Sequence, residues 1–421
     1  MIVRKLCVLV LMLALFGTNG YPQLNEIGKF ELDSWRDRKV VVPFDLINNL
    51  MVIPISINDS DTLRFILDTG VSSTLITELS EDDVIALNYI RTVRISGLGE
   101  GESTEAYYAP GNKIEIGKAV GLDQDVLIMK EDIFHLSSLL GKKVNGLIGY
   151  SLFKDFIVEL DYREERVILH EHHKYSNKYK SKSESDKWIT VPINLFRQKP
   201  YLDVDLTQKD GTTLQVKLLL DSGASHGMAL YHTANEDIHL PEKRIRSFLG
   251  SGISGEIHGY LGRIDTLSID KYNLSDIVAS YPDEDGIRRA LNYSERDGSI
   301  GAEVLRRFKV FINYKEGTMI MKPSRFFRED FSYNIAGMEI ATPYPNVPVY
   351  SVTHVRDSSA AHKADIRKGD ILVEINRKGS QYYELNELNK LFEEEGKRLR
   401  LEILRGEEII RKELLLESEL N

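Results

Sequence analysis

The sequence predicts a mainly β protein made of two similar lobes, followed by a smaller domain of mixed α and β structure. An apolar run that ends in Asp-Thr-Gly at residues 68–70 returns as a run that ends in Asp-Ser-Gly at residues 221–223. Other features recur at nearly the same offset. After residue 323 the pattern changes to short strands alternating with helices, which indicates a separate domain.

The recurrence extends well beyond the two triplets. The distance from Asp68 to the glycine-rich segment 97–101 is 29 residues, as is the distance from Asp221 to segment 250–255. An apolar-Gly element then follows each triplet, 78 residues after the first and 77 after the second. A period of domain size indicates a duplicated lobe, because solenoid repeats are far shorter.

The first 20 residues are typical of a secretory signal peptide. Arg4 and Lys5 precede apolar residues 6–16, and small residues follow. This apolar core is too short to span a bilayer, and no later stretch has the roughly 20 apolar residues of a membrane helix. Cys7, the only cysteine, lies inside this segment. We therefore expect no transmembrane segment, no disulfides, and a secreted or periplasmic location after signal removal.

Charge excludes nucleic acid as a partner. The chain has a net charge of −10, and removing Arg4 and Lys5 with the signal makes it −12. Proteins that bind nucleic acid need a basic patch, and the sequence offers none. Residues 21–38 follow the signal as a polar lead-in.

The first lobe is predicted over residues 39–173. Apolar residues, alternating in the second case, predict strands at 40–42 and 51–57. The polar Asn-Asp-Ser-Asp cluster at 58–61 predicts a turn into a strand that ends at Asp68. Residues 131–140 show the apolar spacing of a short helix. The chain is then predicted to run into a Lys- and Ser-rich linker at residues 174–187.

The linker follows a histidine-rich segment, residues 170–173, that invites a metal interpretation. Three histidines and a glutamate are possible ligands, but they directly follow a strand and lack a second, spaced ligand set. We therefore expect no metal and no other cofactor.

The second lobe is predicted over residues 188–325 and the last domain over residues 332–418. The second lobe repeats the strands of the first, with a hairpin turn at Asp210 and Gly211. In the last domain, residues 382–395 read as a helix that stops at Gly396, before strands 399–404 and 408–415. We expect a chain cut after Met321 to keep a folded two-lobed core.

Two facing carboxylates suffice for peptide hydrolysis without a metal. Such a pair shares one proton, so one member acts as a base toward water and the other as an acid toward the amide. Each triplet alone is an ordinary turn sequence. The matched spacing makes Asp68 and Asp221 the candidate catalytic pair.

Residues 40–170 and 188–323 resemble the retropepsin-type aspartic proteases, whose lobes each carry such a triplet, a glycine-rich flap and an apolar-Gly element. The resemblance implies two pepsin-like β-barrel lobes in a pseudo-dimer and an aspartic endopeptidase that cleaves polypeptides with Asp68 and Asp221. Val71 departs from the alanine that is usual there, a change we expect to be tolerated. The resemblance also assigns loop support to Thr69, Gly70, Ser222 and Gly223, and flap positions to Gly97, Leu98, Gly99, Gly101, Gly250, Gly252 and Gly255.

Residues 358–376 resemble bacterial PDZ domains, with small residues for a short helix, a Gly-Asp turn and a central strand. The resemblance implies a bacterial secreted or envelope protein and an extended peptide ligand, usually a C-terminus. Ala336, Gly337 and Met338 occupy the place of the loop that binds the carboxylate. A glycine between apolar residues is equally typical of a plain strand start.

Three other interpretations stay open. A peptide-binding or scaffold protein could retain the protease fold without cleaving, although intact Asp68 and Asp221 favour the enzyme. Self-processing could cut the lead-in or the linker. His226 could form a Ser-His pair with Ser222 or Ser225, but the sequence shows neither an orienting acid nor an oxyanion-hole motif for a triad.

Overall fold

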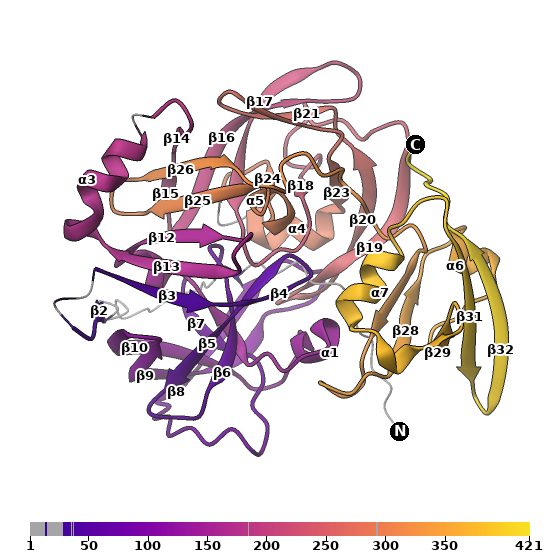
Figure 1. Cartoon of the computed structure of the whole chain (residues 1–421), viewed down its shortest axis with the longest axis horizontal. Coiled ribbons are helices and arrows are strands. Elements are labelled where there is room, and N and C mark those ends of the chain that lie inside the picture. Colours follow the sequence, from indigo (N-terminus) through magenta and orange to yellow (C-terminus); the bar gives the residue numbers. More distant parts are fainter. Residues whose placement is uncertain (1–12, 15–27, 35, 37, 184, 292–293) are drawn as a thin grey trace.

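The computed structural model describes residues 13–14, 28–34, 36, 38–183, 185–291 and 294–421. Two lobes built from strands lie against each other, and a smaller domain packs at one side of the pair (Figure 1). The predicted mainly β class is confirmed. In the described part of the chain, no helix is long and apolar enough to cross a membrane.

Lobe 1 contains a closed barrel. Its sheet has the order β1-β8-β9-β10-β7-β11-β6-β5-β4, and an additional pairing of β9 with β5 closes six of these strands into a ring. The strands are β1 (Leu13–Ala14), β2 (Phe30–Leu32), β4 (Asp45–Ile47), β5 (Leu50–Ile57), β6 (Leu63–Leu67), β7 (Thr74–Ile76), β8 (Arg91–Gly97), β9 (Thr104–Ile116), β10 (Ala119–Met129) and β11 (Gly146–Ile148).

Lobe 2 repeats this strand order as β19-β20-β23-β18-β24-β17-β16-β21-β22. Here β21 takes the place of the end of β9, because the pairing of β21 with β16 corresponds to the pairing of β9 with β5 in lobe 1. The strands are β15 (Asn194–Phe196), β16 (Lys199–Thr207), β17 (Thr213–Leu220), β18 (Met228–Leu230), β19 (Arg244–Gly252), β20 (Gly255–Arg263), β21 (Thr266–Ile269), β22 (Tyr272–Ser275), β23 (Val278–Pro282) and β24 (Gly298–Ile300).

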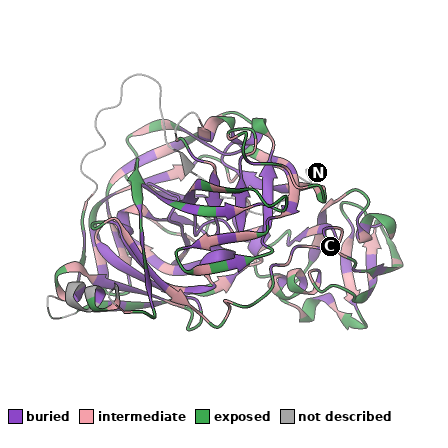
Figure 2. Cartoon of the chain, turned by 90° about the horizontal axis from the view of Figure 1, so that it is seen from above, coloured by how far each residue is buried: buried purple, intermediate pink, exposed green. Residues whose placement is uncertain are grey.

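A shared sheet of six strands joins the two lobes. Its order is β14-β26-β25-β12-β13-β3, so each lobe contributes strands that meet where β12 pairs with β25. The strands are β3 (Lys39–Pro43), β12 (Phe156–Asp161), β13 (Arg166–Glu171), β14 (Ile189–Pro192), β25 (Phe308–Asn313) and β26 (Thr318–Pro323). Buried residues fill the strands in the interior of both lobes (Figure 2).

Parts of the predicted lead-in and linker belong to this core. Phe30 of β2 is buried, and its N–H donates to Asp155. The predicted linker residues form most of α3 (His172–Ser183), whose Tyr175 and Tyr179 pack against Phe311 and Trp188. Apolar anchors spaced four residues apart hold an otherwise polar helix against the shared sheet.

The helix predicted at 131–140 is shorter than expected. Only α1 (Leu136–Leu140) forms, because the Asp132 carboxylate accepts hydrogen bonds from the N–H groups of Phe134 and His135. An Asp side chain that bonds the following backbone competes with the helix. The short helices α2 (Tyr150–Phe153), α4 (Glu284–Leu291) and α5 (Ala302–Leu305) complete the lobes.

The last domain has its own sheet, in the order β27-β28-β29-β31-β32 with β30 beside β29. The predicted helix at 382–395 is α7, which begins at a capping box of Glu384 and Glu387 and ends well before Gly396. The elements are β27 (Met338–Ala341), β28 (Tyr350–Val355), α6 (Ala360–Lys363), β29 (Ile371–Ile375), β30 (Lys378–Gly379), η1 (Ser380–Tyr382), α7 (Leu385–Leu391), β31 (Arg398–Arg405) and β32 (Glu408–Leu415).

Candidate active site

The two Asp triplets end equivalent strands, β6 and β17, at the centre of the lobes. The parallel neighbours β11 and β24 hold the turns: the N–H of Asp68 donates to Ile148 O, and that of Asp221 donates to Ile300 O, both at 2.9 Å. Apolar side chains on β6 and β17 are fully buried, so hydrophobic burial fixes where both strands end.

Crossed hydrogen bonds between Thr69 and Ser222 lock the two turns together. The N–H of Thr69 donates to Ser222 Oγ at 3.0 Å, and the N–H of Ser222 donates to Thr69 Oγ1 at 2.9 Å. Each hydroxyl then donates across the lobe boundary, Thr69 to Leu220 O at 2.6 Å and Ser222 to Leu67 O at 2.8 Å. Four buried bonds thus fix one lobe's triplet against the other's.

The carboxyl groups of Asp68 and Asp221 are completely buried. The N–H of Gly70 donates to Asp68 Oδ1 at 2.6 Å, and that of Gly223 donates to Asp221 Oδ1 at 3.1 Å. A Cβ atom at Gly223 would lie 2.4 Å from Asp68 Oδ2, so only glycine fits there. Within the described protein the Oδ2 atoms of both carboxyl groups have no hydrogen-bond partner.

Burial and mutual proximity separate the acidities of the two carboxyl groups. Burial raises the pKa of Asp68 to about 6, although the hydrogen bond from the N–H of Gly70 and the positive charge of Lys199 both act to lower it. Burial and the negative charge of Asp68 raise the pKa of Asp221 well above its ordinary value. The two carboxyl groups titrate as a pair that holds one proton over a range of pH, which provides a base beside an acid.

Both predicted flaps form hairpins, β8–β9 and β19–β20, and their tips meet. The N–H of Ser254 donates to Leu98 O at 2.9 Å, and the N–H of Gly97 donates to Ser254 Oγ at 3.4 Å. Gly99 has φ +122°, and a Cβ atom there would lie 2.4 Å from the backbone of Ser254. Of the other predicted flap glycines, Gly101 donates to Ser254 O, Gly252 lies against the backbone of Leu98, and Gly250 and Gly255 have positive φ.

Each flap also places an apolar side chain in the other lobe. Leu98 of the first flap packs in a lobe 2 cluster with Leu219 and Ile257. Ile253 of the second flap packs in a lobe 1 cluster with Leu147. Both side chains are only 1% exposed, so the flaps fasten the two lobes together above the carboxyl pair.

Three residues near the carboxyl pair were missed by the sequence analysis. Tyr314 Oη donates to Thr69 O at 3.4 Å beneath the turns. Lys199 and Arg296 are 7% and 6% exposed on the lobe 2 side, and both charges act on Asp221. A comparison of the two lobes position by position could have found Lys199 and Arg296, because it reveals where the repeats differ as well as where they match.

The predicted carboxylate loop of the last domain is engaged within the domain. The N–H of Ala336 donates to Phe392 O at 3.1 Å, and the N–H of Gly337 donates to Asn334 Oδ1 at 3.0 Å. Gly337 has φ +70°, and Met338 starts β27. A peptide carboxylate at this loop would therefore compete with existing bonds.

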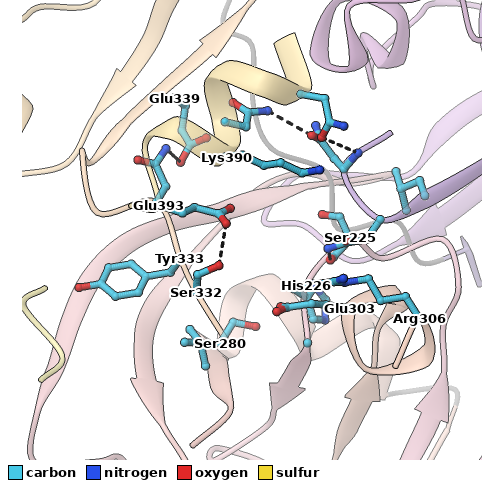
Figure 3. Close-up of a pocket in the computed structure, with 18 of the residues that line it drawn as sticks. Ser225, His226, Ser280, Glu303, Arg306, Ser332, Tyr333, Glu339, Lys390 and Glu393 are labelled. Carbon is cyan, nitrogen blue, oxygen red and sulfur yellow. Dashed lines mark hydrogen bonds between the residues drawn. The ribbon is translucent and has the colours of Figure 1, made fainter. Parts of the chain in front are cut away.

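A cavity of about 710 Å³ lies between the last domain and the lobes. Figure 3 shows Lys390 of α7, and Glu393 just after this helix, across from the segment carrying Ser225 and His226. This segment directly follows the second triplet. A turn of lobe 1 reaches both sides, because Asn49 Nδ2 donates to Ser225 O at 3.0 Å and its neighbour Asn48 accepts from Asn389 of α7.

His226 forms no catalytic pair with a serine. Both of its ring nitrogens are buried without a partner in the described protein, and burial lowers its pKa to about 4. Ser222 is committed to the crossed bonds described above. In the histidine-rich segment, His170 Nε2 instead bonds Glu159 at 2.7 Å, and the described residues contain no group of three or more side chains able to hold a metal.

Comparison with known proteins agrees with this geometry. The comparison with curated proteins gave no match. Residues 53–152 and residues 204–304 each match the aspartyl protease family, and each range holds one Asp triplet, one flap and one apolar-Gly element. The chain therefore carries an aspartyl protease domain twice.

Proposed function

We propose that the protein is an aspartic endopeptidase that hydrolyses peptide bonds with Asp68 and Asp221. The observation that carries this proposal is the crossed pair of Thr69 and Ser222, which fixes two buried carboxyl groups of different acidity side by side. A scaffold protein would gain nothing from burying two carboxyl groups at its centre, because burial of ionisable groups is costly.

The reaction divides between the two carboxyl groups. The ionised member of the pair takes a proton from a water molecule as its oxygen bonds to the peptide carbonyl carbon, while the protonated member donates to the carbonyl oxygen. One carboxyl group then donates its proton to the amide nitrogen, the other takes a proton from a hydroxyl of the tetrahedral intermediate, and the C–N bond breaks to give a carboxyl group and an amine. The pair ends with the single shared proton with which it began.

The flap strands suit an extended substrate. Strand β8 already accepts an antiparallel backbone beside the flap tip, because Leu13 pairs with Gly97 and Ala14 with Ser96. A polypeptide bound in the same way would lie under the flaps with alternate side chains facing each lobe. Water would be excluded once the tips close.

We further propose that the last domain is a PDZ domain that binds an extended peptide and recruits or regulates substrates. Its edge strand β27 supports this, since strand addition needs a sheet edge, and β27 and α7 both line the cavity described above. Because Arg4, Lys5 and the apolar run have the pattern of a signal peptide, we also propose that the chain is secreted or periplasmic. Most of that segment lies outside the described residues.

Cleavage of an unfolded protein substrate tests the enzyme directly. We expect the full chain to cleave it, Asp68→Asn and Asp221→Asn to lose at least about 10³-fold in rate, and pepstatin to inhibit. Asp205→Asn, at an exposed position on β16, is the matched control and should cleave normally. A folded chain that binds peptides yet cleaves none between pH 3 and 8 would instead support the non-catalytic binding protein.

A further inference from the structure

The two lobes differ at the position that faces each candidate catalytic residue. In lobe 1, Val52 of β5 pairs with Ile66 of β6. Because the strands are antiparallel, continuing this register by two residues brings Leu50 opposite Asp68. In lobe 2, β16 pairs Tyr201 with Leu219, and the same step places Lys199 opposite Asp221. Residues opposite each other in an antiparallel pair project to one face of the sheet. A leucine in one lobe is thus replaced by a lysine in the other.

A second pair of equivalent positions differs in the same way. The N–H of Thr77 donates to Asn145 O at 2.8 Å, and the N–H of Tyr231 donates to Asp297 O at 2.7 Å, so Asn145 and Asp297 are counterparts. The residue before each is then also a counterpart. This residue is valine in lobe 1, at position 144, and Arg296 in lobe 2.

The apolar pair and the cationic pair have opposite surroundings. Leu50 and Val144 are fully buried in one hydrophobic cluster of lobe 1. Their counterparts Lys199 and Arg296 are almost as deeply buried, at 7% and 6% exposure. Replacing two core residues by two buried cations is costly for folding, so a lobe that keeps them is expected to use them.

Arg296 lies beside the apolar cluster that holds the tip of the first flap. The Arg296 guanidinium is 5.4 Å from the centre of the Tyr231 ring, and its Nε has no hydrogen-bond partner in the described protein. Tyr231 belongs to the same apolar cluster as Leu98, the residue at the tip of the first flap. Since the charges of Lys199 and Arg296 both act on Asp221, the cationic pair lies on the lobe 2 side of the carboxyl pair.

Two buried cations beside the carboxyl pair favour a negatively charged ligand. Among the described residues, Lys199 and Arg296 bring positive charge to Asp221, whereas their lobe 1 counterparts Leu50 and Val144 carry none. Charge-assisted bonds from Lys and Arg to a carboxylate are strong where water is excluded. An apolar or basic group in the same place would make no such bonds.

We propose that Lys199 and Arg296 form a subsite beside Asp221 that binds a carboxylate of the peptide substrate, either an Asp or Glu side chain or the chain's C-terminal carboxylate. This inference rests on the proposed peptidase function. It assigns to lobe 2 a specificity that lobe 1 lacks.

The acidities around the subsite fit this role. Burial, followed by the charge of Arg296, lowers the pKa of Lys199 to about 7, while Asp68 and Asp221 act to raise it. A bound carboxylate would add a further raising effect, so substrate binding would keep Lys199 charged at neutral pH. Arg296 also lies beside Tyr231, and burial raises the pKa of this tyrosine.

Paired peptides test the subsite in the full chain. Each pair differs only by Glu against Gln, scanned over three positions on either side of the cleaved bond, or by a free against an amidated C-terminus. We expect kcat/KM to favour the acidic member by about 10-fold or more at one position, the effect of one charge-assisted contact. The position that responds separates a side-chain carboxylate from a C-terminal one.

Variants then assign the preference to the two cations. Lys199→Met and the double variant Lys199→Leu with Arg296→Val, which copies lobe 1, should bring the Glu/Gln ratio close to one. Lys199→Arg should retain a preference. Lys217→Met is the matched control, because Lys217 lies against the Tyr201 ring on the face of β17 that leads to Asp221, but it is not part of the cationic pair. This variant should keep the full Glu/Gln ratio.

Binding of peptides with a reduced, uncleavable bond separates this inference from the proposed function. Calorimetry on the unmodified chain needs no variant to fold and no cleavage to occur. If the acidic uncleavable peptide binds more tightly but none of the ordinary peptides is cleaved, the subsite is supported and the peptidase function is refuted. Equal binding and equal cleavage of both members at every position would overturn the subsite and leave the peptidase standing.

Discussion

Lys199 gives the candidate pair an electrostatic asymmetry that the symmetric triplets do not have. Thr69 and Ser222 exchange equivalent bonds, so the backbone of the two turns is nearly the same from either lobe. The positive charges of Lys199 and Arg296 both lower the pKa of Asp221, and only that of Lys199 also lowers the pKa of Asp68. Side chains outside the triplets therefore decide how the pair titrates.

The raised pKa of Asp68 predicts a pH profile displaced from that of an ordinary carboxylate. Because one carboxyl group of the pair must be ionised to accept a proton from water, and burial raises the pKa of both, kcat/KM should fall as pH drops through about 6. Removing a nearby positive charge disfavours the carboxylate, so Lys199→Met should move this acidic limb to higher pH. Steady-state rates from pH 3 to 9 measure the acidic limb of the unmodified chain and that of the variant. Full activity at pH 4 would contradict the assignment.

At the scale of single elements, the flap tips are the parts whose geometry tolerates least change. A Cβ atom at Gly99 would overlap the backbone of Ser254, and its φ of +122° disfavours any side chain. We predict that Gly99→Ala lowers kcat/KM by about 10-fold or more, because misplaced flaps no longer position the substrate. Gly111→Ala is the control, since Gly111 also has a positive φ but no atom within 4 Å of its added Cβ.

Unfolding in denaturant completes the flap experiment. Both glycine variants should lose on the order of 1 kcal/mol of stability from backbone strain, and Gly99→Ala should lose more because its Cβ overlaps the Ser254 backbone. Only the Gly99 variant should lose activity. Equal activity of the two variants would mean that the tips need not meet for cleavage.

At the scale of the whole molecule, the connection to the last domain is part of the two-lobed core. Arg307 is completely buried, and its guanidinium donates to Phe326 O at 3.0 Å and Asp330 O at 3.1 Å. The ring of Phe331 covers the same group at 3.6 Å. The core therefore depends on residues that follow β26.

A cut after Met321, which the sequence suggested as harmless, should accordingly be harmful. It removes these partners and the last two residues of β26, so Arg307 keeps its ion pair with Glu303 at 3.4 Å but loses its backbone acceptors, which costs about 1–3 kcal/mol. A cut after Phe331 should leave a folded core. Thermal unfolding of the two fragments compares them, and Arg307→Met should partly rescue the shorter one. Equal stability would refute this dependence on the connecting segment.

The sequence predicted what is local and repeated, and missed what depends on contacts between distant segments. Both triplets, both flap tips and the two-lobed arrangement follow from local turns and constant spacing. The exchange of Leu98 and Ile253 between lobes, the packing of α3 and the cavity beside α7 arise only when lobes and domains meet. Lys199 was overlooked because a buried lysine looks like a surface residue in an alternating strand.

The exchanged side chains Leu98 and Ile253 imply that the open form of the protein is rare. Opening the flaps exposes both at once, and each such side chain contributes about 1.5–3 kcal/mol when buried. On that scale roughly one molecule in 10² to 10⁴ is open, and every apparent substrate affinity is weakened by the same factor. A peptide long enough to shelter both side chains recovers that energy on binding. The length of a peptide would thus determine how well it binds, independently of the residues at the cleaved bond.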